Sequence, residues 1–453
     1  MRKDVTGKRV TVVGGARSGV SAARLLARAG AAVFLTESGQ LRDSIRESLR
    51  EANVDFEEGG HTPRALEADF VVVSPGVAHS APLYRSSREK GLPIYSEIEI
   101  ASWFCRAPIA AVTGSNGKTT TTSLLGHVFR HSGRRTFVGG NIGTAFADFA
   151  ADAQPDDVVV LEVSSFQLDD IEGFRPRVSM LLNITPDHLD RYEHDLGRYQ
   201  ESKFRVFENQ GEGDTFIYNF DDPVVRERTM RLAEERPALE ILGFSQEAAL
   251  DAGAFLRGGE VVLRVKKEEV LMRAEEISLQ GRHNLYNTLA AAVAARVMEV
   301  RSDSVRESLM SFEGVPHRLE FVRELDGVRY VNDSKATNVN AVWYALESFR
   351  EPVVLIAGGR DKGNDYSSLK PLLREKARAV IAIGESASKV AAELGPEVRQ
   401  HAEAETMEDA LRYARLFAEP GDVVLLSPAC ASFDMFENYE ERGEVFKRLV
   451  NDL

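Results

Sequence analysis

One stretch decides the fold class of this chain: Thr113-Gly114-Ser115-Asn116-Gly117-Lys118-Thr119-Thr120. It lies between an apolar run and a helical pattern. A glycine-rich loop in that setting presents backbone N–H groups and a helix N-terminus to phosphate oxygens. Lys118 adds a positive charge for the terminal phosphates, and the Thr119 hydroxyl is placed to bind Mg²⁺. The loop therefore predicts a nucleotide-phosphate site. Val112 replaces the first glycine of GxxxxGK[ST], so the alternative is a glycine-rich turn with an exposed lysine.

Short apolar runs alternate with helical patterns on both sides of this loop, which predicts βαβ units and parallel sheets. Residues 250–280 differ, because two alternating runs flank Gly258-Gly259 in a hairpin pattern. A long alanine-rich helix is expected next, at about 284–299. The strands are expected at residues 9–13, 32–36, 70–74, 108–113, 158–163, 178–183, 329–331, 353–357, 379–383 and 422–426.

Length and pattern together predict three α/β domains, because 453 residues at roughly 150 per domain give about three. Residues 1–103 are expected to form an N-terminal Rossmann-like parallel sheet. Residues 104–315 are expected to form a central P-loop ATPase-like domain with a small β addition. Residues 316–453 are expected to form a C-terminal Rossmann-like domain.

Composition excludes several functional classes. Apolar residues make up 43% and charged residues 28%, which excludes a largely disordered chain. The net charge of −14 argues against general binding to nucleic acid or anionic membranes. Two cysteines, Cys105 and Cys430, are too few for a disulfide framework or a zinc knuckle. No run approaches the ~20 apolar residues of a membrane span, so a cytoplasmic protein is expected.

A second glycine turn, Gly14-Gly15-Ala16-Arg17-Ser18-Gly19, follows the first expected strand. It matches GxGxxG only if Ala16 replaces the second glycine. Glu37 ends the second strand, where a ribose-binding acid would lie. The turn predicts a Rossmann-like fold that holds some nucleotide without requiring NAD. The alternative is a tight strand–helix turn with no ligand.

The glycine-rich loop resembles the ATP loop of the Mur ligases and of the related folylpolyglutamate synthases. Seven further segments follow in the order typical of the Mur ligases, so the resemblance covers essentially the whole chain. They begin at Leu161 (LEVSSFQL), Asn183 (NITPDHLDR), Tyr199 (YQESKFR), Arg282 (RHNLYN), Pro316 (PHRLE), Asn332 (NDSKATN) and Leu426 (LSPACASFD).

Within that family the chain is most similar to the D-glutamate-adding members. Supporting segments are VVVSPG from Val71, GGNIG from Gly139 and NDSKATN from Asn332. The Asp-Asn-Pro-Arg motif of the diaminopimelate-adding members does not occur. The resemblance implies ATP-dependent addition of D-glutamate to UDP-N-acetylmuramoyl-L-alanine through an acyl phosphate. That step belongs to peptidoglycan precursor synthesis, and so to cell wall formation, cell shape and cell division.

The resemblance also implies which residues act on ATP and metal. Lys118 and Lys335 would lie near the transferring phosphate. Thr119 and Glu162 would bind one Mg²⁺, and His188 would bind a second. Lys203 would carry a CO₂-derived carbamate, because a free ammonium would repel the metal. The alternatives are an ordinary strand-end carboxylate for Glu162, a structural hydrogen-bonding histidine for His188, and a phosphate-binding or surface lysine for Lys203.

The remaining implied contacts fall into three sets, one for each expected ligand. ATP contacts are Gly114, Ser115, Asn116, Gly117, Lys118, Thr119, Thr120, Asn287, Arg318 and Asp333. UDP-substrate contacts in the first domain and beside it are Ser18, Gly19, Glu37, Ser38, Ser74 and Asn141. D-glutamate contacts are Thr337, Lys362, Ser432 and Phe433, with a backbone N–H acting at Phe433. A monomer is expected.

Three other functions compete with this interpretation. A folylpolyglutamate synthase would begin near its ATP loop, which the first ~100 residues here argue against. An NTPase switch would not need the second metal centre that Glu162, His188 and Lys203 imply. A nucleotide-sugar oxidoreductase would use the first glycine turn, but Ala16 and the separate ATP loop argue against it.

Overall fold

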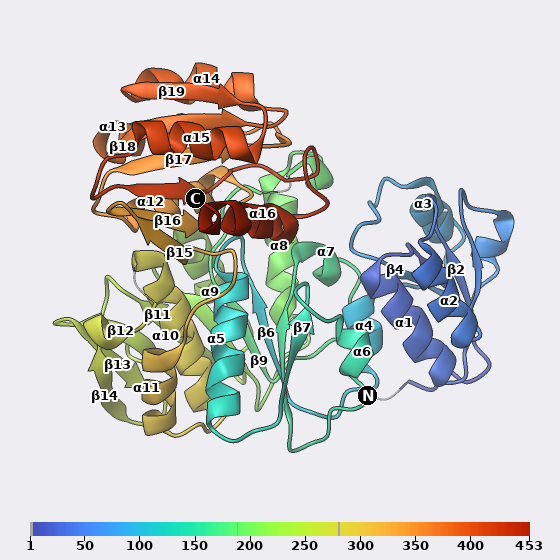
Figure 1. Ribbon diagram of the computed structural model, residues 1–453. Helices are drawn as coiled ribbons and strands as arrows, with labels where there is room; N and C mark the ends of the chain where they lie inside the picture. Colours follow the sequence, from blue (N-terminus) through green and yellow to red (C-terminus); the bar gives the residue numbers. More distant parts are fainter. Residues whose placement is uncertain (1–2, 188, 280) are drawn as a thin grey trace. The chain divides into compact units, whose positions relative to one another are not determined.

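The computed structural model describes residues 3–187, 189–279 and 281–453 (Figure 1). The chain is a three-domain α/β protein, as predicted, with one β-sheet in each domain. It divides into two compact units. The first comprises residues 1–278 and 284–312 and holds two of the sheets, and the second comprises 279–283 and 313–453.

The first sheet has five parallel strands in the order β3-β2-β1-β4-β5. The strands are β1 (Arg9–Val13), β2 (Ala32–Thr36), β3 (Asp55–Glu57), β4 (Phe70–Val73) and β5 (Ile94–Ser96). The helices are α1 (Arg17–Arg28), α2 (Asp43–Glu51), α3 (Pro82–Glu89) and α4 (Glu97–Ser102). The reversal of strand order beside β1 places the turn after β1 at the carboxyl edge, where ligands of such sheets bind.

The second sheet has nine strands in the order β14-β13-β12-β11-β10-β9-β6-β8-β7. The parallel strands are β6 (Ile109–Thr113), β7 (Thr136–Gly140), β8 (Val158–Glu162), β9 (Val178–Leu181), β10 (Thr215–Asn219), β11 (Glu240–Ser245) and β12 (Gly253–Arg257). The antiparallel additions are β13 (Glu260–Arg264) and β14 (Glu268–Arg273). The predicted hairpin at Gly258-Gly259 is confirmed, and it extends the main sheet rather than forming a separate one.

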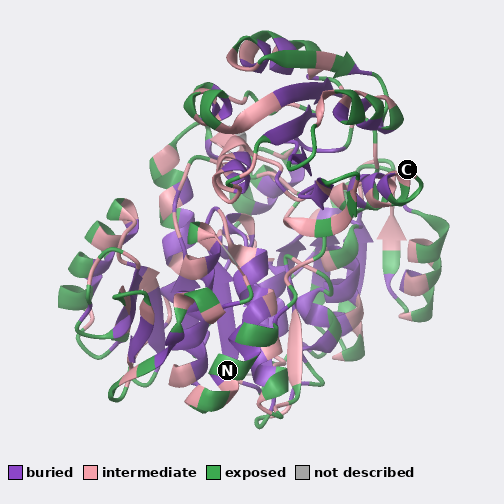
Figure 2. Ribbon diagram, turned by 60° about the vertical axis from the view of Figure 1, so that its left-hand side comes forward, coloured by how far each residue is buried: buried purple, intermediate pink, exposed green. Residues whose placement is uncertain are grey.

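Seven helices of this domain are described: α5 (Lys118–His131), α6 (Phe146–Phe149), α7 (Ser165–Leu168), α8 (Leu196–Phe204), α9 (Pro223–Glu235), α10 (Arg282–Val297) and α11 (Ser302–Ser311). The central strands β6, β8 and β9 are fully buried, while the helices show both buried and exposed positions (Figure 2). This pattern is the one expected of a parallel sheet covered on both faces.

Helix α4 joins the first two domains through two buried carboxylates. Glu99 Oε2 accepts hydrogen bonds from the backbone N–H groups of Glu172 (3.0 Å), Gly173 (2.9 Å) and Phe174 (2.7 Å). Glu97 Oε1 accepts one from the N–H of Ala147 at 2.6 Å. Backbone N–H groups of the central domain therefore donate to one carboxylate oxygen of each of these two glutamates.

The sheet of the second unit has six strands in the order β15-β16-β20-β17-β18-β19, all parallel except the edge strand β15. The strands are β15 (Glu320–Leu325), β16 (Val328–Asn332), β17 (Val353–Gly358), β18 (Ala377–Ile383), β19 (Gln400–Ala404) and β20 (Val423–Leu426). The helices are α12 (Val339–Glu347), α13 (Lys370–Lys376), α14 (Ala387–Leu394), α15 (Met407–Phe417) and α16 (Tyr439–Asn451).

No helix within the described residues is long and apolar enough to cross a membrane. The proposed domain boundaries at 103/104 and 315/316 stay predictions.

Candidate active site

The glycine-rich loop lies between β6 and α5, as its sequence predicts. Gly114 has φ +147° and Gly117 has φ +84°, a backbone region that side chains other than glycine rarely adopt. A Cβ at Gly117 would lie 2.3 Å from Asn287 Oδ1, so glycine also permits the close approach of α10. Lys118 Nζ donates to the carbonyl oxygens of Gly114 (2.9 Å) and Ser115 (2.8 Å), which folds the side chain back over the loop.

The segment that follows β9 and a tyrosine of α8 make hydrogen bonds to the loop. Ser115 Oγ donates to Thr185 O at 2.8 Å and lies 2.9 Å from Tyr199 Oη. The N–H of Asn116 donates to Asn183 Oδ1 at 2.8 Å. Tyr199 has no predicted role, although it lies four residues before Lys203 and therefore on the same helix face. The spacing of four residues from Lys203 is the feature of the sequence that indicates a place for Tyr199 beside the loop.

Thr119 and Glu162 meet at the carboxyl edge of the sheet. Thr119 Oγ1 donates to Glu162 Oε2 at 2.6 Å, and Asn141 Nδ2 donates to Glu162 Oε1 at 3.0 Å. The carboxylate is buried and lies at the end of β8. Hydroxyl and carboxylate oxygens are the ligands that Mg²⁺ prefers, so the donor set fits this ion.

Lys203 is buried beneath the loop. Its Nζ donates to Gly114 O at 2.8 Å and lies 4.7 Å from the centre of the Tyr199 ring. Burial, and next the charge of Lys118, lowers the pKa of Lys203 well below its ordinary value. An amine in this setting favours the neutral form.

The other predicted ATP residues of the first unit lie as follows. Asn287 is buried at the start of α10 and faces Gly117, and its Nδ2 donates to Asn284 Oδ1 at 3.4 Å. The Thr120 hydroxyl is buried and has no hydrogen-bond partner within the described part of the chain. His188 lies outside the described residues.

The turn after β1 is built by close backbone contacts. A Cβ at Gly19 would lie 1.9 Å from Gly14 O, so glycine at this position allows the first turn of α1 to pack against Gly14. Ser74 Oγ donates to the same carbonyl oxygen at 3.1 Å. Ser18 is half-buried in the first turn of α1. Gly19, Ser18 and Ser74 therefore gather around one turn.

Glu37 holds this turn with its carboxylate. Oε2 accepts from the N–H of Gly15 at 2.6 Å, and Oε1 accepts from the N–H of Gly39 at 2.9 Å and from Ser38 Oγ at 3.1 Å. Burial alone would raise the pKa of Glu37, but these hydrogen bonds lower it below its ordinary value. Both carboxylate oxygens thus already have donors from the turn.

Arg17 connects the two predicted parts of the UDP-substrate site. Its guanidinium donates to Gly143 O, in the turn that also carries Asn141. Sequence reasoning gave Arg17 no role. The sequence indicates a role for Arg17 only through its position inside the glycine turn.

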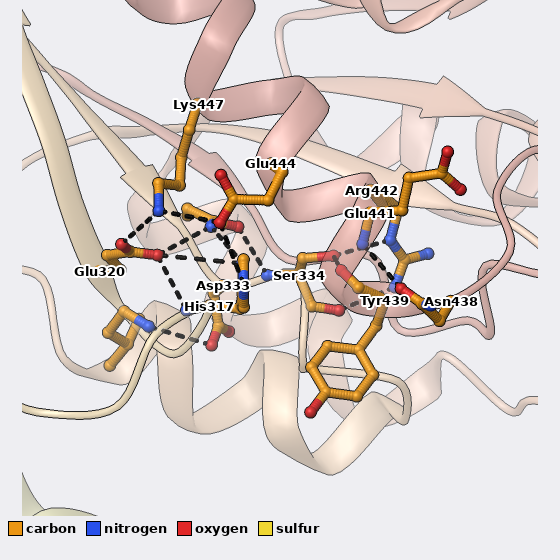
Figure 3. Close-up of polar contacts among 12 residues, drawn as sticks. His317, Glu320, Asp333, Ser334, Asn438, Tyr439, Glu441, Arg442, Glu444 and Lys447 are labelled. Carbon is orange, nitrogen blue, oxygen red and sulfur yellow. Dashed lines mark hydrogen bonds and ion pairs between the residues drawn. The ribbon is translucent and has the colours of Figure 1, made fainter. Parts of the chain in front are cut away.

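In the second unit, Asp333 and Lys335 follow β16. Figure 3 shows Asp333 beside the residues of α16. Asp333 accepts from the N–H of Leu319 at 3.2 Å and from Ser427 Oγ at 2.7 Å. Burial raises the pKa of Asp333 to about 6, against the nearby charge of Arg318. Lys335 Nζ donates to Tyr439 Oη at 2.7 Å and lies 4.5 Å from the centre of that ring.

The predicted D-glutamate residues lie on three loops that touch one another. The N–H of Ala429 donates to Ala336 O at 2.9 Å, and the N–H of Arg360 donates to Ala431 O at 2.9 Å. These contacts bring together the loops that carry the four predicted side chains. Ser432 is buried, Thr337 is half-buried, and Lys362 and Phe433 are exposed.

The chain therefore has three α/β domains, and the central one carries a P-loop between a strand of its sheet and the following helix. These features define the class of multidomain P-loop α/β proteins. Three family models match the chain. They are the MurD N-terminal domain at residues 9–82, the Mur ligase middle domain at 112–295 and the Mur ligase, glutamate ligase domain at 317–430. The chain belongs to the Mur ligase family.

Curated relatives match along their whole length. The UDP-N-acetylmuramoylalanine--D-glutamate ligase of Salinibacter ruber is 60% identical over 456 residues, covering 99% of both chains. The protein of the same name from Chloroherpeton thalassium is 44% identical over 467 residues, covering 100% of this chain and 99% of its own.

Solved structures of the family share the fold. UDP-N-acetylmuramate-alanine ligase MurC from Thermotoga maritima gives a TM-score of 0.61 at 18% identity, covering 98% of this chain and 99% of its own. MurF ligase from Thermotoga maritima in complex with ADP gives a TM-score of 0.61 at 18% identity, covering 100% of both chains.

Proposed function

We propose that this protein is an ATP-dependent ligase that joins D-glutamate to UDP-N-acetylmuramoyl-L-alanine in peptidoglycan precursor synthesis. The observation that carries the proposal is the 60% identity to the Salinibacter ruber ligase over 99% of both chains. Because the match covers 99% of this chain, it includes all three of the domains described above. We further propose that the protein works as a monomer in the cytoplasm, where ATP is available.

The reaction needs positioning and charge stabilisation rather than a protein nucleophile. The L-alanine carboxylate attacks the γ-phosphorus of ATP, which gives an acyl phosphate and ADP. The D-glutamate amine then attacks the acyl carbon, and the amide forms as phosphate leaves. The N–H groups of residues 114–120 and the ammonium of Lys118 hold the phosphates, while Lys335, Arg318 and Asp333 act from the second unit.

Metal binding is proposed at the meeting point of Thr119 and Glu162, because their oxygens lie 2.6 Å apart at the edge of the phosphate loop. His188 is proposed as a ligand of a second Mg²⁺. Bound Mg²⁺ would neutralise developing phosphate charge. Asn287, which faces Gly117, is proposed to contact the adenine nucleotide.

Lys203 is proposed to carry a carbamate. The neutral amine is the form that adds CO₂, and burial together with the charge of Lys118 favours the neutral form here. Carbamylation replaces this buried amine by an anionic carbamate, whose oxygens can bind a metal close to Gly114. This change suits a site that collects Mg²⁺ and phosphate.

The two acceptor substrates are proposed to bind at the other clusters described above. The UDP portion contacts Ser18, Gly19, Glu37, Ser38, Ser74 and Asn141. D-glutamate contacts Thr337, Lys362, Ser432 and the backbone at Phe433. Its two carboxylates need cations, hydroxyls and N–H groups, which these positions offer.

The direct test is ADP release with Mg-ATP and UDP-N-acetylmuramoyl-L-alanine. D-glutamate, L-glutamate, L-alanine, L-lysine and meso-diaminopimelate are compared as acceptors. Release with D-glutamate alone is expected. Release with another amino acid would move the specificity to another member of the family, and no release with any of them would contradict the proposal.

A further inference from the structure

A strained turn carries Arg318, which is proposed above to bind ATP. The residues on either side of it have left-handed backbones, with φ +63° at His317 and φ +45° at Leu319. Residues with a Cβ adopt this region at a cost, so such a turn persists only where its surroundings hold it. The Arg318 Nε atom is buried and has no hydrogen-bond partner among the described residues.

Glu320 follows the turn directly, and its side-chain carboxylate folds back onto it (Figure 3). Oε2 accepts from the N–H of His317 at 2.8 Å and from Asn332 Nδ2 at 3.0 Å. Oε1 forms an ion pair with Lys447 Nζ at 2.9 Å. Burial alone would raise the pKa of Glu320, but the N–H of His317 and the ammonium of Lys447 lower it. Glu320 therefore stays ionised and accepts three contacts.

Helix α16 supplies Lys447 and packs closely against the turn. A Cβ at Gly443 would lie 2.1 Å from His317 Nδ1, so glycine allows the helix to approach. Glu444 Oε1 lies 3.2 Å from Lys447 Nζ and 3.6 Å from His317 Nε2. The carboxylate of Glu320 thus lies between the turn and the C-terminal helix.

The same turn touches two other proposed ATP-site residues. The N–H of Leu319 donates to Asp333 Oδ1 at 3.2 Å, and the N–H of Lys335 donates to His317 O at 3.0 Å. A displacement of the turn would therefore disturb Arg318, Asp333 and Lys335 together.

We propose that Glu320 and Lys447 are positioning residues, whose ion pair holds the 317–319 turn so that Arg318 is directed at the nucleotide phosphates. The inference rests on the proposed ligase function. Neither side chain is assigned a contact with substrate. Both act through the backbone conformation of the turn.

The test measures steady-state kinetics of the full-length protein. Glu320→Gln removes the ion pair and keeps one acceptor oxygen. It is expected to raise the KM for ATP about three- to tenfold while kcat changes less than about twofold, because the loss falls on nucleotide positioning. Lys447→Met is expected to act in the same direction, and Lys447→Arg to restore the KM. An unchanged KM for ATP in both Glu320→Gln and Lys447→Met would overturn the proposal.

A double-mutant cycle with Arg318→Ala separates positioning from general destabilisation. If Glu320 acts mainly through Arg318, then Glu320→Gln raises the KM for ATP by a smaller factor once Arg318 is truncated. The same fold-change in both backgrounds would overturn the proposal. Arg374→Met, which breaks the ion pair with Glu397 elsewhere in this unit, is the matched control and leaves the KM unchanged.

Binding of a fluorescent ATP analogue is measured on every variant. It distinguishes failure of this inference from failure of the proposed function. Absence of ligase turnover in the unsubstituted protein would count against the function, whereas an unaltered dissociation constant in Glu320→Gln would count against the positioning role. If Glu320→Gln does not fold, Lys447→Met and Lys447→Arg decide the question.

Discussion

Glu97 shows at the scale of one residue how burial sets a protonation state. Its Oε1 accepts the N–H of Ala147, while its Oε2 is buried with no hydrogen-bond partner in the described part of the chain. Burial raises the pKa of Glu97 to about 7, with Asp148 adding to the shift and Arg17 opposing it. A carboxyl whose folded pKa is raised stabilises the fold below its unfolded pKa of 4.5, and this stability is lost as pH rises through about 7.

Glu97→Gln is therefore expected to change the pH dependence of stability. Glutamine resembles the protonated acid and does not titrate. Relative to the unsubstituted protein, the variant should gain free energy of unfolding, of the order of 3 kcal/mol, as pH rises from 4.5 to above 7. Urea unfolding at several pH values measures this. The exposed control, Glu212→Gln, should show no such trend, and a pH-independent difference for Glu97→Gln would contradict the expectation.

Lys203→Ala tests the proposed carbamate at the same scale. Loss of the anionic oxygen donor is expected to lower kcat by about a hundredfold or more. Added formate or acetate should restore part of the activity, because a small carboxylate can occupy the space and supply the missing charge. Lys118→Ala is the control, and no carboxylate should restore it. Equal rescue of both variants, or of neither, would argue against a carbamate.

At the scale of elements, α16 depends on a single glycine for its approach to the 317–319 turn. Gly443→Ala would place a methyl carbon 2.1 Å from His317 Nδ1. Overpacking at a buried contact of this kind is expected to cost about 1–3 kcal/mol of unfolding free energy. Denaturant unfolding measures it, with Arg448→Ala on the exposed face of the same helix as the control. Equal stability of the two variants would show that the helix moves aside without cost.

Helices and strands could be predicted where the sequence pattern that indicates them is local. The run before Gly114 is apolar and ends at a glycine loop, and the structure has strand β6 there. Lys203 and Gly114 are 89 residues apart, and Glu320 and Lys447 are 127 apart, so no spacing rule reveals their contacts. Glu37 shows a different limit, because its sequence position predicts a ribose contact but gives no sign that both carboxylate oxygens accept hydrogen bonds from the turn. Site motifs were thus accessible from sequence, but the residues that brace them were not.

At the scale of the whole molecule, the proposed ATP contacts belong to both compact units. Residues 114–120 and Asn287 lie in the first unit, while Arg318 and Asp333 lie in the second. A ligand that binds the folded form stabilises every unit it contacts. Binding of one nucleotide should therefore raise the unfolding temperature of both units.

Scanning calorimetry with a non-hydrolysable ATP analogue and Mg²⁺ tests this expectation. Two transitions are expected, and both should move to higher temperature, with about 2.7 kcal/mol of added stability at a hundredfold excess over Kd. Arg318→Ala should shrink the shift of the second unit and leave that of the first. A rise confined to the first unit would contradict nucleotide contact from the second.

The connection made by α4 has an evolutionary consequence. Glu97 and Glu99 bind main-chain N–H groups of Ala147 and of residues 172–174, and every amino acid except proline supplies such a group. The receiving surface can therefore diverge in sequence without losing these bonds, while the two glutamates cannot. At this junction the hydrogen bonds therefore constrain the two glutamates more than the residues whose N–H groups they bind.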